Sequence, residues 1–199
     1  MQTSSLDVLD LLVLYYGSAY TENYSPYGEK LLIEMIEKSM EEEKYEEAIQ
    51  QGLALLKDYP ASAELYYNVS IAYLLNGDTL TGQKFFDNYA SLISIPFFSG
   101  NGIESDSAFV VRCVADEYLI MQEMGYEREE QSLIDIDGIP YDLMKVVDED
   151  GNKASLYFNI YQPYVLGMKN MFDEKNGKKN KKQKKKQVKR DRKKEKKSN

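Results

Sequence analysis

Apolar residues near the start of the chain recur at intervals of three and four positions, at Leu6, Leu9, Leu12, Val13 and Tyr16. This spacing places them on one face of an α-helix. Ser4 or Ser5 can cap the start of that helix with a side-chain oxygen. The pattern therefore predicts an N-terminal helix over residues 5–20.

The same helical spacing continues through residues 29–96 in four segments, at about 27–40, 45–58, 61–76 and 79–93. They form two copies of one helical pair offset by 34 residues, with the small residues Ala48 and Gly82 at matching positions. A period of 34 residues is typical of tetratricopeptide repeats. The second copy resembles that pattern at Tyr66, Val69, Ser70, Tyr73 and Phe86.

After a Gly-rich loop, a further long helix is predicted over 106–125. The pattern then changes to short apolar runs bounded by turn residues, at Leu133–Ile136, Tyr141–Val147 and Ala154–Tyr161. Asp148–Asn152 is a favourable hairpin connector, so residues 132–162 are predicted to form an antiparallel hairpin or three-stranded meander. Pro163 opens a short helix predicted over 163–173.

These elements predict an α+β fold that is mainly α, with two tetratricopeptide-like helical hairpins and a small C-terminal antiparallel β element. We expect one helical-repeat domain over residues 1–174, followed by a Lys-rich disordered tail over 175–199. Two repeats are fewer than such arrays usually need, so the N-terminal helix, the helix at 106–125 and the β element are expected to complete the core.

Charge divides the chain at the same boundary. Residues 175–199 hold 15 Lys and Arg against 2 acids, a charge of +13, whereas residues 1–174 hold 10 basic and 31 acidic residues, a charge of −21. The acidic body repels nucleic acid and anionic surfaces, so either could bind only through the tail. The tail is also expected to contact acidic residues of its own body, in a manner that salt weakens.

Several kinds of chemistry are excluded by composition. The chain has no His, which removes the commonest general base and nearly all zinc sites, and its one Cys, Cys113, lies in an apolar run and is expected to be buried. No phosphate-binding Gly motif is present, and no cofactor or metal is expected. Asp135–Gly138 and Asp148–Gly151 resemble parts of a calcium loop, but their spacing favours turns. Whether the protein is an enzyme stays uncertain, and a non-enzymatic role is favoured.

Tyrosine is abundant, with 17 residues, and five of them lie close together at Tyr15, Tyr16, Tyr20, Tyr24 and Tyr27. Packing between helices with hydrogen-bonded hydroxyls is the favoured interpretation. An aromatic binding surface is the alternative, because Tyr is enriched in interface hot spots.

Three short motifs, LYYG at 14–17, YSPY at 24–27 and FNIY at 158–161, resemble a bacterial domain family of unknown function over about residues 5–172. The resemblance implies a Tyr-rich N-terminal segment, a tetratricopeptide-like middle and a short β C-terminus, but no activity. Members of that family often look exported, while Asp7 and Asp10 interrupt any signal peptide here, so location stays open. No apolar run reaches the length of a transmembrane segment.

The tetratricopeptide resemblance implies a concave face lined by the first helix of each pair. The residues expected to line that groove are Lys30, Ile33, Glu34, Glu37, Glu41, Glu64, Tyr67, Asn68 and Ile71. Their charge indicates a basic protein or peptide segment as the partner. The favoured function is therefore a non-enzymatic interaction scaffold, and the alternatives are a carboxylate-dependent enzyme or a tether acting through the tail.

Overall fold

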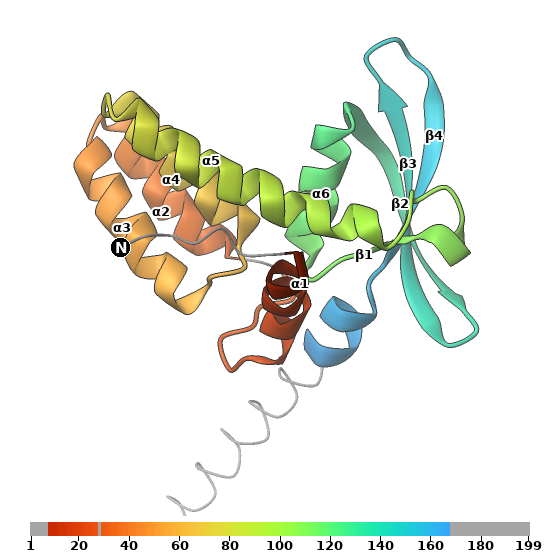
Figure 1. Cartoon of the computed structure of the whole chain (residues 1–199). Helices are drawn as coiled ribbons and strands as arrows, with labels where there is room; N and C mark the ends of the chain where they lie inside the picture. The colour runs from red at the N-terminus through yellow and green to blue at the C-terminus, as the bar shows by residue number, and fades with distance from the viewer. Residues whose placement is uncertain (1–7, 28, 168–199) are drawn as a thin grey trace, which may run out of the picture.

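The computed structural model describes residues 8–27 and 29–167. Four helices, α2 (Lys30–Glu41), α3 (Tyr45–Asp58), α4 (Ala63–Leu75) and α5 (Thr79–Ser94), gather on one side of the molecule (Figure 1). A four-stranded sheet lies on the other side, with α6 (Val114–Glu123) between. The mixed α and β class that the sequence predicts is confirmed.

The N-terminal helix α1 (Val8–Gly17) continues into a 3₁₀ turn, η1 (Ser18–Tyr20). Its inward side carries the buried Tyr15 and Ala19, whereas Leu9 and Val13 are exposed. The helix is therefore rotated relative to the predicted apolar face, because burial of Tyr15 takes precedence over burial of two aliphatic side chains. Residues 5–7 of the predicted range lie outside the described residues.

The helices α2 to α5 pack as successive neighbours, and α2 also contacts α4. Side chains define the starts of the second pair: Ser62 Oγ accepts from Leu65 N, and Asp78 Oδ1 accepts from Thr81 N. Gly77 has a φ of 87°, which lets the chain turn sharply between α4 and α5. A 3₁₀ turn, η2 (Ile95–Phe98), with Pro96 near its start, follows α5.

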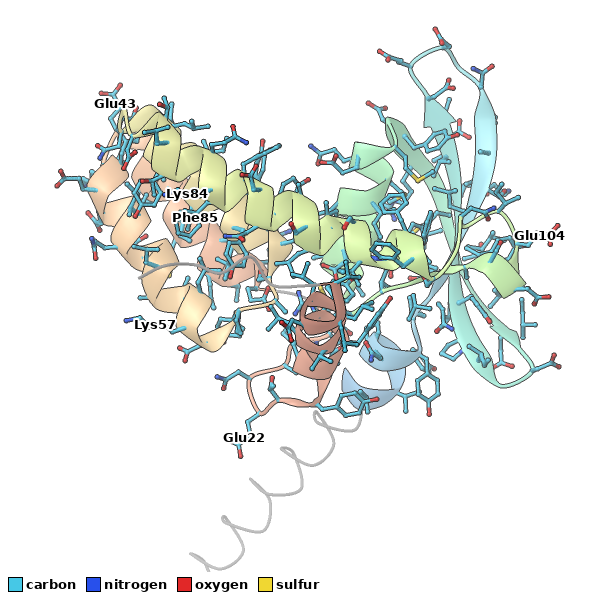
Figure 2. The ribbon with its side chains drawn as sticks, in the orientation of Figure 1. Glu22, Glu43, Lys57, Lys84, Phe85 and Glu104 are labelled. Atoms are coloured by element: carbon cyan, nitrogen blue, oxygen red, sulfur yellow. The ribbon has the colours of Figure 1, made fainter. Side chains whose placement is uncertain are left out.

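Two glycines allow neighbouring helices to approach closely. A Cβ atom on Gly52 of α3 would lie 2.2 Å from Val69 Cγ2, and one on Gly82 of α5 would lie 2.9 Å from the Leu74 side chain. Figure 2 shows Phe85 on the side of α5 that faces α4, where its ring stacks on Tyr73 with 5.3 Å between ring centroids. The small residues and the aromatic pair together fix the spacing of α5 against α4.

The sheet has the strand order β1-β4-β3-β2. Strands β2 (Tyr126–Ile136), β3 (Ile139–Asp148) and β4 (Lys153–Asn159) are antiparallel neighbours, and β1 (Phe109–Val110) pairs in parallel with β4. The prediction that confined the sheet to residues 132–162 is therefore wrong: β1 precedes α6 in the chain, and β2 begins at Tyr126.

The helix predicted over 106–125 begins only at Val114. A short 3₁₀ turn, η3 (Ser105–Ser107), and strand β1 replace its first half, because the β-forming run at 109–111 reaches β4, where Val111 N donates to Asn159 O at 3.3 Å. Cys113 has extended backbone (φ −147°) and its N–H donates to Asp116 Oδ2, which caps the start of α6.

The interior contains two hydrophobic clusters. The larger one joins α1, α5, α6 and the sheet around Tyr15, Phe109, Met144 and Phe158. The smaller one lies among α2, α3 and α4 around Ile33, Ile36 and Leu65. The first cluster shows that α1 and α6 complete a core that the four central helices do not close by themselves.

The two Asp-rich segments at the hairpins are turns, as the sequence favours. Asp135 Oδ1 accepts from Gly138 N between β2 and β3, and Asp148 Oδ1 accepts from the amides of Asp150 and Asn152 between β3 and β4. Beyond β4, a short π-helical turn, η4 (Gln162–Leu166), begins one residue before the helix predicted over 163–173 and overlaps its first four residues. Residues 168–173 and the tail 175–199 lie outside the described residues.

Overpacking at the helix contacts should destabilise the fold. We expect Ala48→Leu and Gly82→Leu each to lower the free energy of unfolding by about 1–3 kcal/mol, because the buried Ala48 and the contact of Gly82 with Leu74 leave no space. Urea denaturation measures this change. Gly17→Ala is the control: Gly17 is helical, no atom lies within 4 Å of its added Cβ, and Ala favours a helix by up to about 1 kcal/mol. Unchanged midpoints for both Leu variants would contradict this packing.

Candidate functional site

The predicted groove residues lie on α2 and α4, but two of them cannot contact a ligand. Ile33 is buried in the smaller core, and Asn68 is buried with its Nδ2 donating to Glu64 O at 3.0 Å. The remaining members are exposed or partly exposed: Lys30, Glu34, Glu37, Glu41, Glu64, Tyr67 and Ile71. We call these seven residues the α2/α4 face.

Glu64 is the electrostatic centre of the α2/α4 face. Its pKa is raised, first by burial and then by the negative charges of Glu29 and Glu37, with Lys30 acting in the opposite direction. Among the described residues, no cation lies within ion-pair distance of Glu34, Glu37, Glu41 or Glu64. The face therefore carries negative charge that the described part of the protein does not neutralise.

Aromatic rings border this face. Tyr67 packs against Tyr89 of α5 with 5.2 Å between ring centroids, and Phe86 packs against the same ring at 5.5 Å. Tyr89 is buried and donates a hydrogen bond to Glu123 Oε1 of α6. More than a third of each side chain of Tyr67 and Phe86 is exposed, so the pair offers an aromatic surface on a rigid base.

A buried charge cluster lies where α1, α2, α4 and α6 meet, centred on Arg112. Its guanidinium nitrogens lie 3.5 Å from Glu29 Oε1 and 3.6 Å from Asp116 Oδ2, and all three residues are at most 5% exposed. Tyr15 Oη donates to Asp116 Oδ2 at 2.6 Å, and Ser62 Oγ donates to Glu29 Oε2 at 2.7 Å. One cation thus connects two acids from opposite halves of the chain.

A cavity of about 380 Å³ lies beside this cluster, with Arg112 and Glu29 in its wall. Val13 and Leu14 of α1 and the Tyr59–Ala61 turn supply its apolar sides. Glu29 Oε1 and Arg112 Nε accept or donate no hydrogen bond among the described residues, but each lies at ion-pair distance from the other cluster members. The cluster is therefore satisfied by charge, and we interpret it as a structural joint.

The tyrosines of the segment at residues 15–27 divide between packing in the interior and exposure at the surface. Tyr15 and Tyr24 are buried, and Tyr24 Oη donates to Arg112 O at 2.7 Å; burial is the main cause that raises the pKa of both hydroxyls. Tyr16 is partly buried and donates to Val110 O at 3.3 Å. Tyr20 and Tyr27 are exposed. Packing therefore explains the first three, and an accessible surface remains for the last two.

Cys113 belongs to the same buried layer. Its side chain is fully buried, its Sγ accepts a hydrogen bond from the Arg112 guanidinium at 3.3 Å, and burial raises the pKa of the thiol well above its ordinary value. A protonated, inaccessible thiol is a poor nucleophile, as expected from the sequence.

A second buried acidic pair joins α6 to the sheet. Glu117 is fully buried, Asp142 of β3 is 5% exposed, and the two carboxyl groups lie close enough for each to affect the pKa of the other. Burial raises both pKa values, and the charge of Asp142 raises that of Glu117 further. Gln131 of β2 connects the pair to a cation: its Nε2 donates to Asp142 Oδ2 at 2.7 Å, while its Oε1 accepts from Arg128 at 2.9 Å.

Arg112, Glu117 and Asp142 are not predicted by the sequence patterns as members of a site. A signal for the two acids exists in the pattern: Glu117 lies at helical spacing between the apolar Val114 and Met121, and Asp142 alternates with Met144 and Val146. A carboxylate on an apolar face is either costly or functional. No comparable signal marks Arg112, because its partners are 83 residues before it and four residues after it.

Within residues 8–27 and 29–167, no three His, Cys, Asp or Glu side chains are grouped as metal ligands. No helix in that region is long and apolar enough to cross a membrane.

The Arg112 cluster predicts that removing one hydroxyl group, that of Tyr15, strongly lowers the stability of the fold. Tyr15→Phe removes the hydroxyl that donates to Asp116 and accepts from Arg112 N, so we expect the free energy of unfolding to fall by about 1.5–3 kcal/mol. Tyr73→Phe is the control, because the Tyr73 hydroxyl forms no hydrogen bond with any described residue; its effect should stay within about 0.5 kcal/mol. Equal effects of the two substitutions in urea denaturation would contradict the role of the cluster.

The Glu117–Asp142 pair predicts a pH-dependent stability. Because the pKa of Glu117 is raised by folding, the folded protein keeps a proton that the unfolded chain loses above its ordinary value of 4.5. The free energy of unfolding should therefore fall as pH rises from about 4.5.

Glu117→Gln removes this titration, so the variant should gain stability over the parent between low pH and pH 7. Urea denaturation at several pH values measures the gain. Glu149→Gln, at an exposed hairpin turn, should run parallel to the parent at every pH. A parallel curve for Glu117→Gln would refute the buried proton.

The chain was compared with known proteins. No curated protein and no solved structure matches it. A family described as a domain of unknown function (DUF4919) matches residues 2–169, which is most of the chain and agrees with the resemblance that the sequence motifs indicated. The protein therefore belongs to the DUF4919 family of domains of unknown function.

Proposed function

We propose that the protein is a non-enzymatic interaction scaffold, in which two tetratricopeptide-like hairpins, α2–α3 and α4–α5, bind a basic protein segment on the α2/α4 face. The order of packing supports this proposal, because each of the four helices packs against the next and α2 also contacts α4. First helices that lie side by side present a continuous surface.

The proposal rests on the negative charge around Glu64, which no described cation neutralises at ion-pair distance. The Glu64 carboxyl is partly buried, and its pKa is raised first by burial and then by the negative charges of Glu29 and Glu37, so holding it ionised there has an energetic cost. A Lys or Arg side chain placed there would relieve the repulsion and form partly desolvated ion pairs. Basic segments are therefore favoured over acidic or neutral ones.

The aromatic border supplies a second anchor. Tyr67 and Phe86 are half-exposed and rest on the buried ring of Tyr89, so they lose little conformational freedom on binding. A basic side chain stacked on them would add a cation–π contact worth about 0.5–1 kcal/mol at an exposed site.

A ligand carboxylate does not fit this face. Asn68, the donor that tetratricopeptide proteins use to hold a peptide C-terminus, is buried and its Nδ2 is bonded to Glu64 O. Glu34, in the equivalent place of the first hairpin, is an acid. Both features exclude recognition of a free C-terminus.

The carboxylate-dependent enzyme is the second candidate, because Glu117 and Asp142 are two neighbouring acids with raised pKa values. Their geometry disfavours it. Glycosidases separate their carboxyl groups by about 5 Å or more so that substrate or water lies between them. Here the two carboxyl groups lie close enough to shift each other's pKa, and Glu117 is fully buried.

Neutralising the α2/α4 face should abolish preference for a basic segment. We expect the variant Glu34→Gln/Glu37→Gln/Glu64→Gln to bind a labelled peptide of alternating Lys and Ala about tenfold more weakly, because each ion pair contributes a few tenths of a kcal/mol to about 1 kcal/mol. Fluorescence anisotropy with the full chain measures the dissociation constant.

The matched control changes the net charge equally at three exposed glutamates elsewhere, in Glu22→Gln/Glu127→Gln/Glu149→Gln. Glu22 lies in the loop after η1 (Figure 2). This control should keep the affinity within about twofold. If both triple variants lose the same affinity, the attraction is diffuse and the proposed site is wrong.

A further inference from the structure

A second cavity, of about 340 Å³, lies on the sheet at the first turn of α6. It forms because α6 covers the Met144 and Val146 end of the sheet face and reaches Asp142 through Glu117, but leaves Leu133 uncovered; Leu133 is the cross-strand neighbour of Asp142 and is 57% exposed. Pro26 and Tyr27 close one side of the cavity, and Pro163 and Tyr164 of η4 close another. We call it the β-face pocket.

Asp142 is the one acid that the described residues contribute to the wall of this pocket, and Gln131 is its polar neighbour among mostly apolar and aromatic lining residues. One of its oxygens, Oδ2, already accepts from Gln131 Nε2, and Gln131 is held in turn by Arg128. Its other oxygen, Oδ1, accepts no hydrogen bond from a described nitrogen or hydroxyl donor. The carboxyl group is thus oriented by Gln131, and since an oxygen accepts two hydrogen bonds, a lone pair stays available for a cation even when Glu117 shares a proton with it.

Glu117 lies beneath Asp142 and accounts for the charge of the site. Both of its carboxyl oxygens are fully buried, and no donor of the described residues reaches either one. A shared proton between the two acids is the arrangement that satisfies them, which leaves one negative charge at the floor of the pocket. Arg128 is the nearby cation, but it bonds to Gln131 and stacks over Tyr118 of α6, with 5.4 Å between its Cζ and the ring centroid.

We propose that the β-face pocket binds a primary ammonium group on an aliphatic stem, as carried by a lysine side chain, through an ion pair with Asp142. The apolar wall, including Val114 and Ile160, suits the methylene stem, and the rings of Tyr27 and Tyr164 border the position of the charge.

An ammonium group suits this site better than a guanidinium. Arginine pairs best with a carboxylate by engaging both oxygens at once. Gln131 already occupies Asp142 Oδ2, so only a compact, single-point cation can use the remaining acceptor without displacing an internal hydrogen bond. The site therefore distinguishes two basic side chains of equal charge.

The chain holds lysines a short distance along the sequence from this pocket. Gly167, the last described residue, packs so closely on Pro26 in the pocket wall that an added Cβ would lie 2.4 Å from Pro26 Cβ. Residues 175–199, which hold 15 Lys and Arg, therefore begin eight residues from the edge of the pocket. A lysine can come from this segment or from a separate molecule, and the two sources need separate arms in a test.

The β-face pocket is separate from the α2/α4 face, and lysine binding there does not depend on the proposed function. NMR on the full chain tests this binding, with the side-chain amide of Gln131 as the reporter, because that amide donates to the same Asp142 carboxyl group that would bind the ligand. The probe is Nα-acetyl-lysine methylamide. The control ligand is the norleucine analogue, which has the same stem and no charge.

We expect the lysine probe to shift the Gln131 amide resonance saturably at millimolar concentration, and the norleucine analogue to leave it unchanged. Asp142→Asn should weaken the probe at least tenfold. Glu117→Gln should bind it within about threefold of the parent, because Gln is neutral like the protonated acid and donates to Asp142 in the same way.

A third variant tests the geometry without touching the acidic pair. Leu133→Lys places a tethered ammonium on the exposed rim opposite Asp142, so it should occupy the site and abolish probe binding, whereas Leu133→Met should not. Folding of each variant is checked from the dispersion of its amide spectrum.

The source of the lysine is resolved by a variant with every Lys and Arg of 175–199 replaced by Gln. Binding of the probe to both the full chain and this variant supports a site open to an outside lysine. Binding only to the variant supports occupation by the chain's own segment. Failure of the probe to bind both the full chain and the variant, or equal affinity of the variant for the probe with and without Asp142→Asn, would overturn the proposal.

Discussion

The arrangement of the helices around the sheet depends on one buried cation, Arg112. It lies just before α6 and connects Glu29, at the start of α2, with Asp116 in the first turn of α6. A buried ion pair contributes little stability relative to well-packed apolar side chains, but removing one partner leaves an unpaired charge that costs about 3–5 kcal/mol. The cluster therefore penalises any arrangement in which α2 and α6 do not meet at Arg112. Tyr15 and Tyr24 also hydrogen-bond to this cluster, so the positions of α1 and of the loop after it depend on the same contacts.

The two acidic groups of residues, the α2/α4 face and the pair of Glu117 and Asp142, differ in their exposure to solvent. The carboxylates of the α2/α4 face are mostly solvated, so water and salt weaken their attraction for a ligand and the face can accept varied basic segments. The pair of Glu117 and Asp142 is shielded from solvent, and burial raises the pKa of both groups. An ion pair with a shielded charge in an apolar pocket is strong only when the cation fits the site. Under the two proposals, the protein would therefore combine a permissive surface with a selective pocket.

The sequence predicted the helical part of the fold well because each helix carries its own signal. Apolar spacing, Gly77 after α4 and the cap at Asp78 are local features, and the observed helices follow them. Strand β1 could not be predicted in the same way, since residues 109–111 have a strand only because β4 supplies a parallel neighbour. The interior positions of Ile33 and Asn68 depend on how α2 turns against α4, which spacing alone leaves undetermined. Charged residues were the hardest to place, because Arg112, Glu117 and Asp142 are buried only by virtue of partners remote in the chain.

The hydrogen bond between Tyr15 and Asp116 spans 101 residues of sequence, and this separation has a consequence for the order of folding. Contacts of such length form after local ones, because closing a long loop costs entropy before any contact repays it. During synthesis at about 5–20 residues per second, α1 must wait roughly 5–20 s for its partner to appear. The helices α2 to α5 are complete well before then, and their mutual contacts are local. Although α1 precedes the other described helices in the chain, it is thus among the last to dock, and its apolar side chains lack their folded-state neighbours during the interval.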